Sequence, residues 1–296
     1  DRIKYHAISK TNTSKNIGKT KPKYQDIFSN WVVDMAREDS DLVAITPAMR
    51  EGSGLVEFSK EFPERYFDVA IAEQHAVTLS AGLACEKKKP VVAIYSTFLQ
   101  RAYDQLIHDV ALQNLDVTFA IDRAGLVGED GPTHSGNYDL VYLRCIPNMI
   151  VMTPSDENET RKLLTTGFLH NGPASIRYPR GSGPNVIVEN DLSPVEIGKG
   201  RLIEEGSKDL IVINFGALLD QAREVASTLG LTLIDMRFVK PLDEDILRKY
   251  LSEAQAFVSI EDGSVAGGAG SAVQEFCSDN NINIKSKLFG IPDIFI

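Results

Sequence analysis

Two short segments place side chains capable of chemistry directly after apolar runs. In Asp68–His75 an apolar stretch ends at Glu73, and small residues follow it. Residues 95–104 set Tyr95, two hydroxyl groups and Phe98 after another apolar run. A carboxyl group at a strand-to-helix junction lies where α/β sheets place their ligands, and aromatic rings with hydroxyls can line a pocket. These residue types therefore suit a binding pocket that carries one acidic group.

A glycine-rich loop adds basic and titratable side chains. Residues 122–136 hold four glycines, one proline, Arg123, Asp130 and His134 within 15 positions. Long loops of this composition are more often functional than structural. A shorter loop at 176–181 also follows an apolar run and carries two arginines.

Each of these features also has a purely structural interpretation. Glu73 in the first turn of a helix would complement the helix dipole. Tyr95 and Phe98 fit a hydrophobic core as well as a pocket, and Arg177 fits an ordinary surface or ion-pair residue, so it receives no role. The functional interpretation depends on convergence, because parallel strands deliver the loops at their carboxyl ends to one edge of a sheet.

The elements that must position these residues alternate along the chain. Apolar runs of strand length alternate with segments of helical periodicity, which predicts an α/β protein with mostly parallel sheets and helices on both faces. A Gly-, Pro-, Asn- and Ser-rich stretch at 181–194 interrupts the alternation, which then restarts. We expect a flexible linker at 1–23, one domain at 24–183 and a smaller one at 195–296. Strands are expected at 42–46, 90–95, 117–121, 149–152, 174–178, 210–214, 231–235, 256–260 and 282–287, and helices at 24–37, 73–85, 98–112, 155–170, 217–229, 243–251 and 266–277.

Composition argues against several classes of function. The 296 residues are 43% hydrophobic and 24% charged, enough for two globular cores. A net charge of −10 argues against nucleic acid as a partner, although residues 1–23 carry seven basic and one acidic side chain. The apolar runs fall short of the roughly 18 residues of a membrane span. Three scattered cysteines without a CxxC pair fit a reducing cytoplasm.

Taken together, the motifs resemble those of the 1-deoxy-D-xylulose-5-phosphate synthases, a family of transketolase-like thiamine-diphosphate enzymes. The resemblance covers about residues 24–296. It rests on several motifs in the right order, namely Ile45–Leu55, Ile71–His75, Tyr95–Arg101, Ile121–Gly125, Asp130–His134, Arg177–Gly181, Asp235–Leu242 and Gly267–Gly270.

The resemblance implies a site for part of a cofactor. In this family thiamine diphosphate lies between two α/β domains, one holding the diphosphate through a divalent metal and the other holding the aminopyrimidine. This chain is similar to the pyrimidine-binding domain (24–183) followed by the C-terminal domain (195–296). Glu73 would hydrogen-bond a pyrimidine ring nitrogen and favour the tautomer that activates the thiazolium. Phe98 would stack on the pyrimidine, and Tyr95 would contact both cofactor and substrate.

The same resemblance implies the substrates and the residues near them. Pyruvate would be decarboxylated and condensed with glyceraldehyde 3-phosphate, a step toward isoprenoid precursors and thiamine. Arg101 and Asp130 would lie near the substrates, and His134 would act as a catalytic proton shuttle. Arg123 and Arg180 would hold the phosphate group. The family leads us to expect a homodimer.

One motif of the family is missing. The sequence contains no Gly-Asp-Gly, the family's metal and diphosphate motif; Glu129–Gly131 and Glu261–Gly263 have Glu in place of the first glycine. That glycine lets the backbone approach the diphosphate closely. We therefore expect no metal site here, and we place Mg²⁺ in an N-terminal diphosphate-binding domain absent from this chain. The chain alone is expected to be inactive.

Three other interpretations remain open. A 2-oxo acid dehydrogenase β subunit also lacks the metal motif, and a transketolase is a further possibility, but the arginine-bearing loops favour the synthase. A non-catalytic oligomerisation module would not need Glu73, Phe98 or His134. Gly267–Gly270 superficially resembles a phosphate loop, but its spacing favours tight helix packing.

Overall fold

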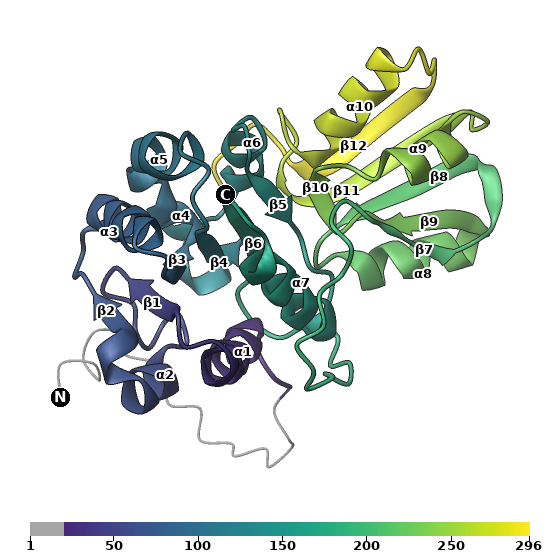
Figure 1. Cartoon of the computed structure of the whole chain (residues 1–296). Coiled ribbons are helices and arrows are strands. Elements are labelled where there is room, and N and C mark those ends of the chain that lie inside the picture. Colours follow the sequence, from purple (N-terminus) through teal and green to yellow (C-terminus); the bar gives the residue numbers. More distant parts are fainter. Residues whose placement is uncertain (1–20) are drawn as a thin grey trace.

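Residues 21–296 are described by the computed structural model, and they are built around two sheets (Figure 1). The first has seven strands in the order β10-β5-β6-β4-β3-β1-β2, and the second has five in the order β12-β11-β8-β9-β7. Neighbouring strands are parallel except for the pairs β10–β5 and β7–β9. The predicted α/β class with two mostly parallel sheets is therefore confirmed.

The first unit spans α1 to β6. Its elements are α1 (Tyr24–Glu38), β1 (Leu42–Thr46), α2 (Val56–Glu61), β2 (Tyr66–Asp68), α3 (Glu73–Cys85), β3 (Lys89–Tyr95), α4 (Ser96–Leu99), α5 (Tyr103–Gln105), β4 (Thr118–Ala124), α6 (Asp139–Arg144), β5 (Ile150–Met152), α7 (Glu157–Leu169) and β6 (Ala174–Pro179).

The second unit follows β6. Its elements are β7 (Arg201–Glu204), β8 (Ser207–Phe215), α8 (Leu219–Leu229), β9 (Leu231–Asp235), β10 (Phe238–Lys240), α9 (Glu244–Leu251), β11 (Ala256–Ser264), α10 (Ala269–Asp279) and β12 (Lys285–Ile291). Among the helices of residues 21–296, none has both the length and the apolar character that crossing a bilayer requires.

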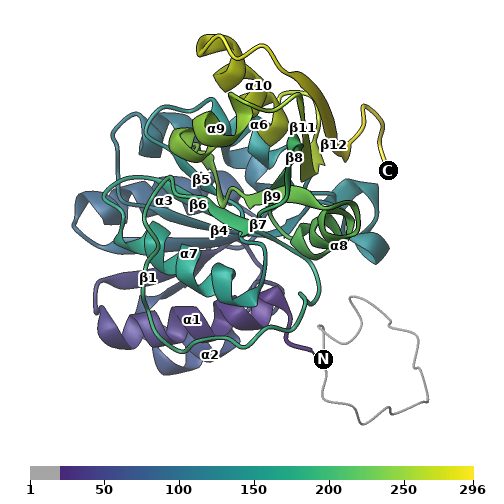
Figure 2. The ribbon, with the colours of Figure 1, turned by 90° about the vertical axis from the view of Figure 1, so that its right-hand side faces the viewer.

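Helices α1 and α7 pack side by side on one face of the first sheet (Figure 2). Phe28 and Trp31 are fully buried there, because they recur at helical spacing on the inner face of α1. The indole of Trp31 donates to Thr165 Oγ1 at 3.0 Å, so the polar atom of this ring is satisfied within the core.

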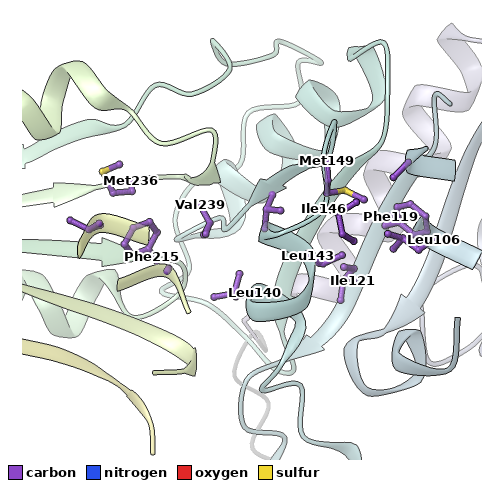
Figure 3. Close-up of a cluster of buried hydrophobic side chains, with 14 of the residues drawn as sticks. Leu106, Phe119, Ile121, Leu140, Leu143, Ile146, Met149, Phe215, Met236 and Val239 are labelled. Atoms are coloured by element: carbon purple, nitrogen blue, oxygen red, sulfur yellow. The ribbon is translucent and has the colours of Figure 1, made fainter. Parts of the chain in front are cut away.

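A continuous hydrophobic core joins the two units (Figure 3). Leu140 and Leu143 of α6 and Met149 of the first unit belong to the same buried cluster as Phe215 and Met236 of the second. The second unit also contributes β10 to the first sheet, where Phe238 pairs with Met152. The two sheets are therefore linked by shared packing as well as by the connecting segment.

The segment predicted as one helix over 98–112 is helical but not a single α-helix. The segment contains α4, a 3-10 turn at 100–102, α5 and a π-helical turn at 106–111. The wider turn places Leu106, Val110 and Ala111 together on the buried side, so core packing overrides regular helical geometry.

Other boundaries differ from the expectations. The apolar stretch before Glu73 is not a strand: β2 ends at Asp68, and residues 69–72 connect it to α3. Helix α7 begins at Glu157 rather than at the expected 155, because Asp156 is its N-cap and accepts from Glu159 N. The final strand begins three residues later than the expected 282. The short elements α2, β2, α6, β7 and β10 were not predicted.

The glycine-rich turn before α10 packs closely, as expected. A Cβ on Gly270 would lie 2.2 Å from Ser259 Oγ. Glu261 accepts from the backbone N–H groups of Ala269 and Gly270 at 2.8 and 2.9 Å. An internal carboxylate already occupies this helix N-terminus, so the turn is a packing feature.

Residues 1–20 of the predicted linker lie outside the described residues. At its end, Lys23 pairs with Ser182 in an isolated β-bridge, and Tyr24 N donates to Gly181 O at 3.0 Å. The start of α1 is therefore tied to the loop that follows β6.

Candidate active site

Three neighbouring strands bring the predicted residues to one edge of the first sheet. Tyr95 is the last residue of β3 and pairs in register with Asp122 of β4. Pro179 at the end of β6 pairs with Ala124. Because these strands are parallel, their carboxyl ends lie together, and the loops that follow them share a single edge.

Aromatic rings form the centre of this edge. Tyr95 and Phe98 are stacked with their centroids 5.1 Å apart and an interplanar angle of 11°. His134 contacts Phe98 edge-on at 5.5 Å, and its Nδ1 lies 2.9 Å from Thr133 Oγ1. Burial raises the pKa of Tyr95 above its usual range, so its hydroxyl stays protonated. Phe98 is half-buried and keeps surface available to a planar ligand.

Arg123 and Arg180 lie beside the aromatic rings, together with Asp130. The Arg123 guanidinium lies 4.1 Å from the centroid of the Tyr95 ring. Arg180 Nε lies 3.2 Å from Asp130 Oδ2, and Arg123 Nε lies 3.9 Å from the same oxygen. The backbone of Arg123 has a φ of 59°, an uncommon conformation for a residue with a side chain.

The Arg123 side chain is only partly satisfied. Its Nη1 donates to Asp122 Oδ2 at 2.8 Å and to Gly52 O at 3.0 Å. Its buried Nε has no hydrogen-bond partner among residues 21–296. An unpaired buried donor is costly, and the oxygen of a bound anion would satisfy it. The arrangement therefore fits a phosphate group.

These arginines open onto a cavity of about 510 Å³. Lys23 adds a third cation to its lining. Another cavity of about 590 Å³ lies between the two units, beside Leu126 and Phe289, and none of the predicted site residues lines it. Asp122 and Glu129 also line the arginine-lined cavity, which adjoins the aromatic rings through Arg123, because that guanidinium lies over Tyr95.

Glu73 is the first residue of α3 and is only 3% exposed. Its Oε1 accepts from Arg101 Nη1 at 2.8 Å. Its Oε2 makes no hydrogen bond within the described part of the chain, so it is free to contact a ligand ring nitrogen. A buried carboxyl that keeps one oxygen free, while an arginine from the turn after Phe98 holds the other, fits the aminopyrimidine of thiamine diphosphate.

The predicted site residues therefore form two groups. Tyr95, Phe98, Arg123, Asp130, His134 and Arg180 make one chain of contacts. Glu73 and Arg101 make a separate pair, and Arg101 comes from the same turn region as Phe98. The structure places Arg101 on Glu73 rather than in the arginine-lined cavity.

Three residues of the site were missed in the sequence. Asp122 is 1% exposed, and burial raises its pKa to about 6, although Arg123 opposes the shift. A Cβ on Gly52 would lie 2.2 Å from the Tyr95 hydroxyl, so only glycine fits there. Lys23 lies in the predicted linker. Asp122 could have been predicted, because it lies at the end of a strand beside Arg123. For Gly52 the sequence showed only that it belongs to a family motif, and for Lys23 only that it is basic.

Within residues 21–296, no group of three or more His, Cys, Asp or Glu side chains is placed to hold a metal ion. Of the two near-miss acidic motifs, Glu261 caps α10, and Glu129 is an exposed residue at the rim of the arginine-lined cavity, with its Oε2 3.9 Å from Arg180 Nη2.

Comparisons with known proteins show the family of this chain. Residues 20–185 match the family model "Transketolase, pyrimidine binding domain", and residues 198–296 match "Transketolase, C-terminal domain". The whole chain is 61% identical over 302 residues to 1-deoxy-D-xylulose-5-phosphate synthase of Pseudomonas syringae pv. tomato, and it covers 48% of that protein. Identity to the Pseudomonas fluorescens synthase is 60%, again with 48% covered.

The chain thus spans about half the length of the curated relatives it matches. A solved structure described as "Split gene transketolase, inactive beta4 tetramer" superposes with a TM-score of 0.84 at 30% identity, covering 93% of this chain and 91% of that one. The chain therefore belongs to the transketolase family, with its pyrimidine-binding and C-terminal domains, and it is a homologue of the 1-deoxy-D-xylulose-5-phosphate synthases.

Proposed function

We propose that this chain is the pyrimidine-binding and C-terminal portion of a 1-deoxy-D-xylulose-5-phosphate synthase, which condenses pyruvate with glyceraldehyde 3-phosphate and releases carbon dioxide. The supporting observation is the cavity lined by Arg123 and Arg180, in which Arg123 also lies over the Tyr95 ring that stacks on Phe98. A cation pair next to a cofactor platform suits a phosphorylated acceptor. A 2-oxo acid dehydrogenase subunit would have no use for it.

Bound thiamine diphosphate supplies the electron sink that decarboxylation of pyruvate requires. In our proposal, Phe98 packs against the pyrimidine and excludes water from one face. Glu73 holds a proton at the pyrimidine ring nitrogen through its free Oε2, while Arg101 fixes the other oxygen. The carboxyl group is thereby oriented before the cofactor arrives.

The substrate side of the site follows from the second group of residues. Arg123 and Arg180 bind the phosphate of the acceptor, with Arg123 Nε as an available donor. Asp130 lies within 3.9 Å of both guanidinium groups and sets their spacing. His134 exchanges a proton with the acceptor oxygen, because an imidazole nitrogen can either donate or accept one. Burial raises the pKa of Tyr95, so its hydroxyl stays protonated and can donate a hydrogen bond to the cofactor or the substrate.

A complete site needs a second, diphosphate-binding domain that holds Mg²⁺. Three observations support this part of the proposal: the sequence lacks Gly-Asp-Gly, the relatives are about twice as long, and the similar solved structure is described as an inactive assembly. We further propose that residues 24–183 and 195–296 form the two domains, and that the chain assembles as a homodimer.

Complementation tests this function. The N-terminal half of the Pseudomonas syringae synthase would be co-expressed with this chain, and condensation would be measured with pyruvate and glyceraldehyde 3-phosphate. We expect product only from the combination. Titration calorimetry of this chain alone with thiamine diphosphate and Mg²⁺ should show no micromolar binding. Micromolar binding of thiamine diphosphate by the chain alone would contradict the proposal. So would a mixture of the two halves that consumes pyruvate but not the phosphorylated aldehyde.

A further inference from the structure

Arg177 is a buried cation that the proposed chemistry does not use. It lies in β6, is 3% exposed, and faces away from the arginine-lined cavity toward the second unit. Its Nε donates to Asp139 Oδ2 at 2.9 Å, and its Nη1 pairs with Asp262 of β11. One guanidinium thus joins a carboxylate of the first unit to a carboxylate of the second.

The same side chain reaches the glycine-rich loop. Arg177 Nη2 donates to Gly136 O at 3.3 Å. Gly136 and Gly125 exchange two backbone hydrogen bonds of 2.8 and 2.7 Å, which close the neck of the loop that carries Asp130 and His134. The contact with Arg177 is therefore made where both ends of the loop meet.

The second unit also contacts the other side of this neck. A Cβ on Gly125 would lie 2.9 Å from Asp262 O and 3.0 Å from Asp262 Oδ2, so Asp262 packs directly against Gly125. Ser264 N donates to Asn137 O at 2.8 Å, which adds a backbone tie one residue beyond Gly136. Two consecutive regions of β11 thus hold the two ends of the loop.

From these contacts we infer that Asp262 and Arg177 are positioning residues: the C-terminal domain clamps the neck of the 125–136 loop and thereby sets the place of His134 and Asp130 against the rings and arginines of the site. The inference rests on the proposed function for the role of the loop in substrate binding. The clamp itself rests on the contacts of Arg177 and Asp262 alone.

Loosening the neck of the loop should weaken binding of the acceptor's phosphate group. Arg180 Nη1 donates to Val127 O inside the loop at 3.1 Å, and Arg180 Nε contacts Asp130. A loosened neck would release both partners of Arg180. We therefore expect the KM for glyceraldehyde 3-phosphate to depend on the clamp, whereas the KM for pyruvate should not.

Asp262→Asn is the informative variant. One guanidinium faces two carboxylates here, so removing the charge of Asp262 leaves Arg177 balanced by Asp139. Arg177→Met would leave the buried Asp139 and the partly buried Asp262 without a cation, so this variant could fail to fold. Arg177→Lys serves as the second variant, because one ammonium group keeps the charge but cannot reach three acceptors.

Hydrogen exchange of the whole chain tests the clamp without reference to substrate. The amides of Gly125 and Gly136 should exchange about tenfold faster in Asp262→Asn and in Arg177→Lys. The matched control is Glu159→Gln, which removes a buried carboxylate that also bridges the units through Arg237, at 2.6 and 2.9 Å, but lies on α7. Exchange at the loop neck should not change in this control.

Kinetics of the complemented enzyme test the consequence. Asp262→Asn should raise the KM for glyceraldehyde 3-phosphate by about tenfold, with the KM for pyruvate unchanged. Unchanged exchange at Gly125 and Gly136, or equal acceleration in Glu159→Gln, would overturn the inference whatever the activity. Faster exchange with an unchanged KM would support the clamp and count against the proposed substrate role of the loop.

Discussion

Arg101 donates to Glu73 Oε1 across 2.8 Å, from a 3-10 turn that follows the helix of Phe98. The side chain of Arg101 is 57% exposed, whereas that of Glu73 is 4% exposed. An accessible cation thus holds a buried acid by one oxygen and leaves the other oxygen free. We therefore propose that Arg101 positions Glu73, and its expected place near the substrates stays a prediction.

Glu73→Gln should abolish most turnover. An amide cannot hold a proton for the pyrimidine nitrogen, so in the complemented enzyme kcat should fall by about 10²-fold or more. Steady-state rates and exchange of the thiazolium C2 proton in the bound cofactor would both report the loss. Glu86→Gln, at the other end of α3, is the control and should remain active. Unchanged turnover in Glu73→Gln would favour a non-catalytic module.

Phe98→Leu should weaken cofactor binding without unfolding the chain. The ring stacks on Tyr95 and is half-buried, and the loss of one aromatic contact amounts to about 0.5–1.5 kcal/mol, or up to about tenfold in Kd. Titration of the complemented enzyme with thiamine diphosphate measures this change. Phe62→Leu removes a comparable ring contact with Phe58, 5.3 Å away, and should leave cofactor affinity as it was. Equal losses in both variants would contradict a specific role for Phe98.

Arg180→Gln should impair use of the phosphorylated acceptor. The loss of a charge-assisted hydrogen bond corresponds to about 1.5–3 kcal/mol, so the KM for glyceraldehyde 3-phosphate should rise by roughly 10- to 100-fold. With unphosphorylated glyceraldehyde the variant and the wild type should behave alike. Arg223→Gln, on the exposed side of α8, is the control. A variant that loses the same factor with both aldehydes would show that Arg180 does not bind phosphate.

Asp122→Asn should change how stability depends on pH. Burial raises the pKa of Asp122 to about 6 in the folded chain, above its ordinary value, with Arg123 opposing the shift. The protonated carboxyl therefore stabilises the folded state below about pH 4, and this contribution is lost as pH rises through about 6.

Urea unfolding of wild type and Asp122→Asn across that window measures the effect. The wild-type advantage over the variant should shrink by on the order of 2–3 kcal/mol between about pH 4 and about pH 7. Asp104→Asn, exposed on α5, supplies the control for a generic substitution. A difference that is flat over the window would contradict the raised pKa of Asp122.

Regular elements could be predicted from the sequence with their bounds. Strand β1, helix α3 and strand β9 have the predicted bounds, because each is a regular apolar or amphipathic run between turn residues. The π-helical turn at 106–111 and strand β10 were not predictable in this way. Both arise from packing against parts of the chain distant in sequence, which override local periodicity.

The same distinction applies to the site. Tyr95, Arg123 and Arg180 could be placed because each ends or follows a parallel strand, and neighbouring strand ends must meet. The pairing of Arg177 with Asp262 spans 85 residues and two sheets, so no spacing in the sequence reveals it. The contact of Arg101 with Glu73 spans 28 residues and depends on the break in the helix that carries Phe98.

Strand β10 has a consequence for how this architecture can be recombined. It lies on the edge of the first sheet, although it belongs to the second half of the chain, and it covers β5. A hybrid joined within 181–194 would pair β5 of one parent with β10 of another, and a truncation there would leave β5 as an open edge, prone to aggregation. The two halves are therefore interchangeable between relatives only when the β5–β10 pair is inherited together.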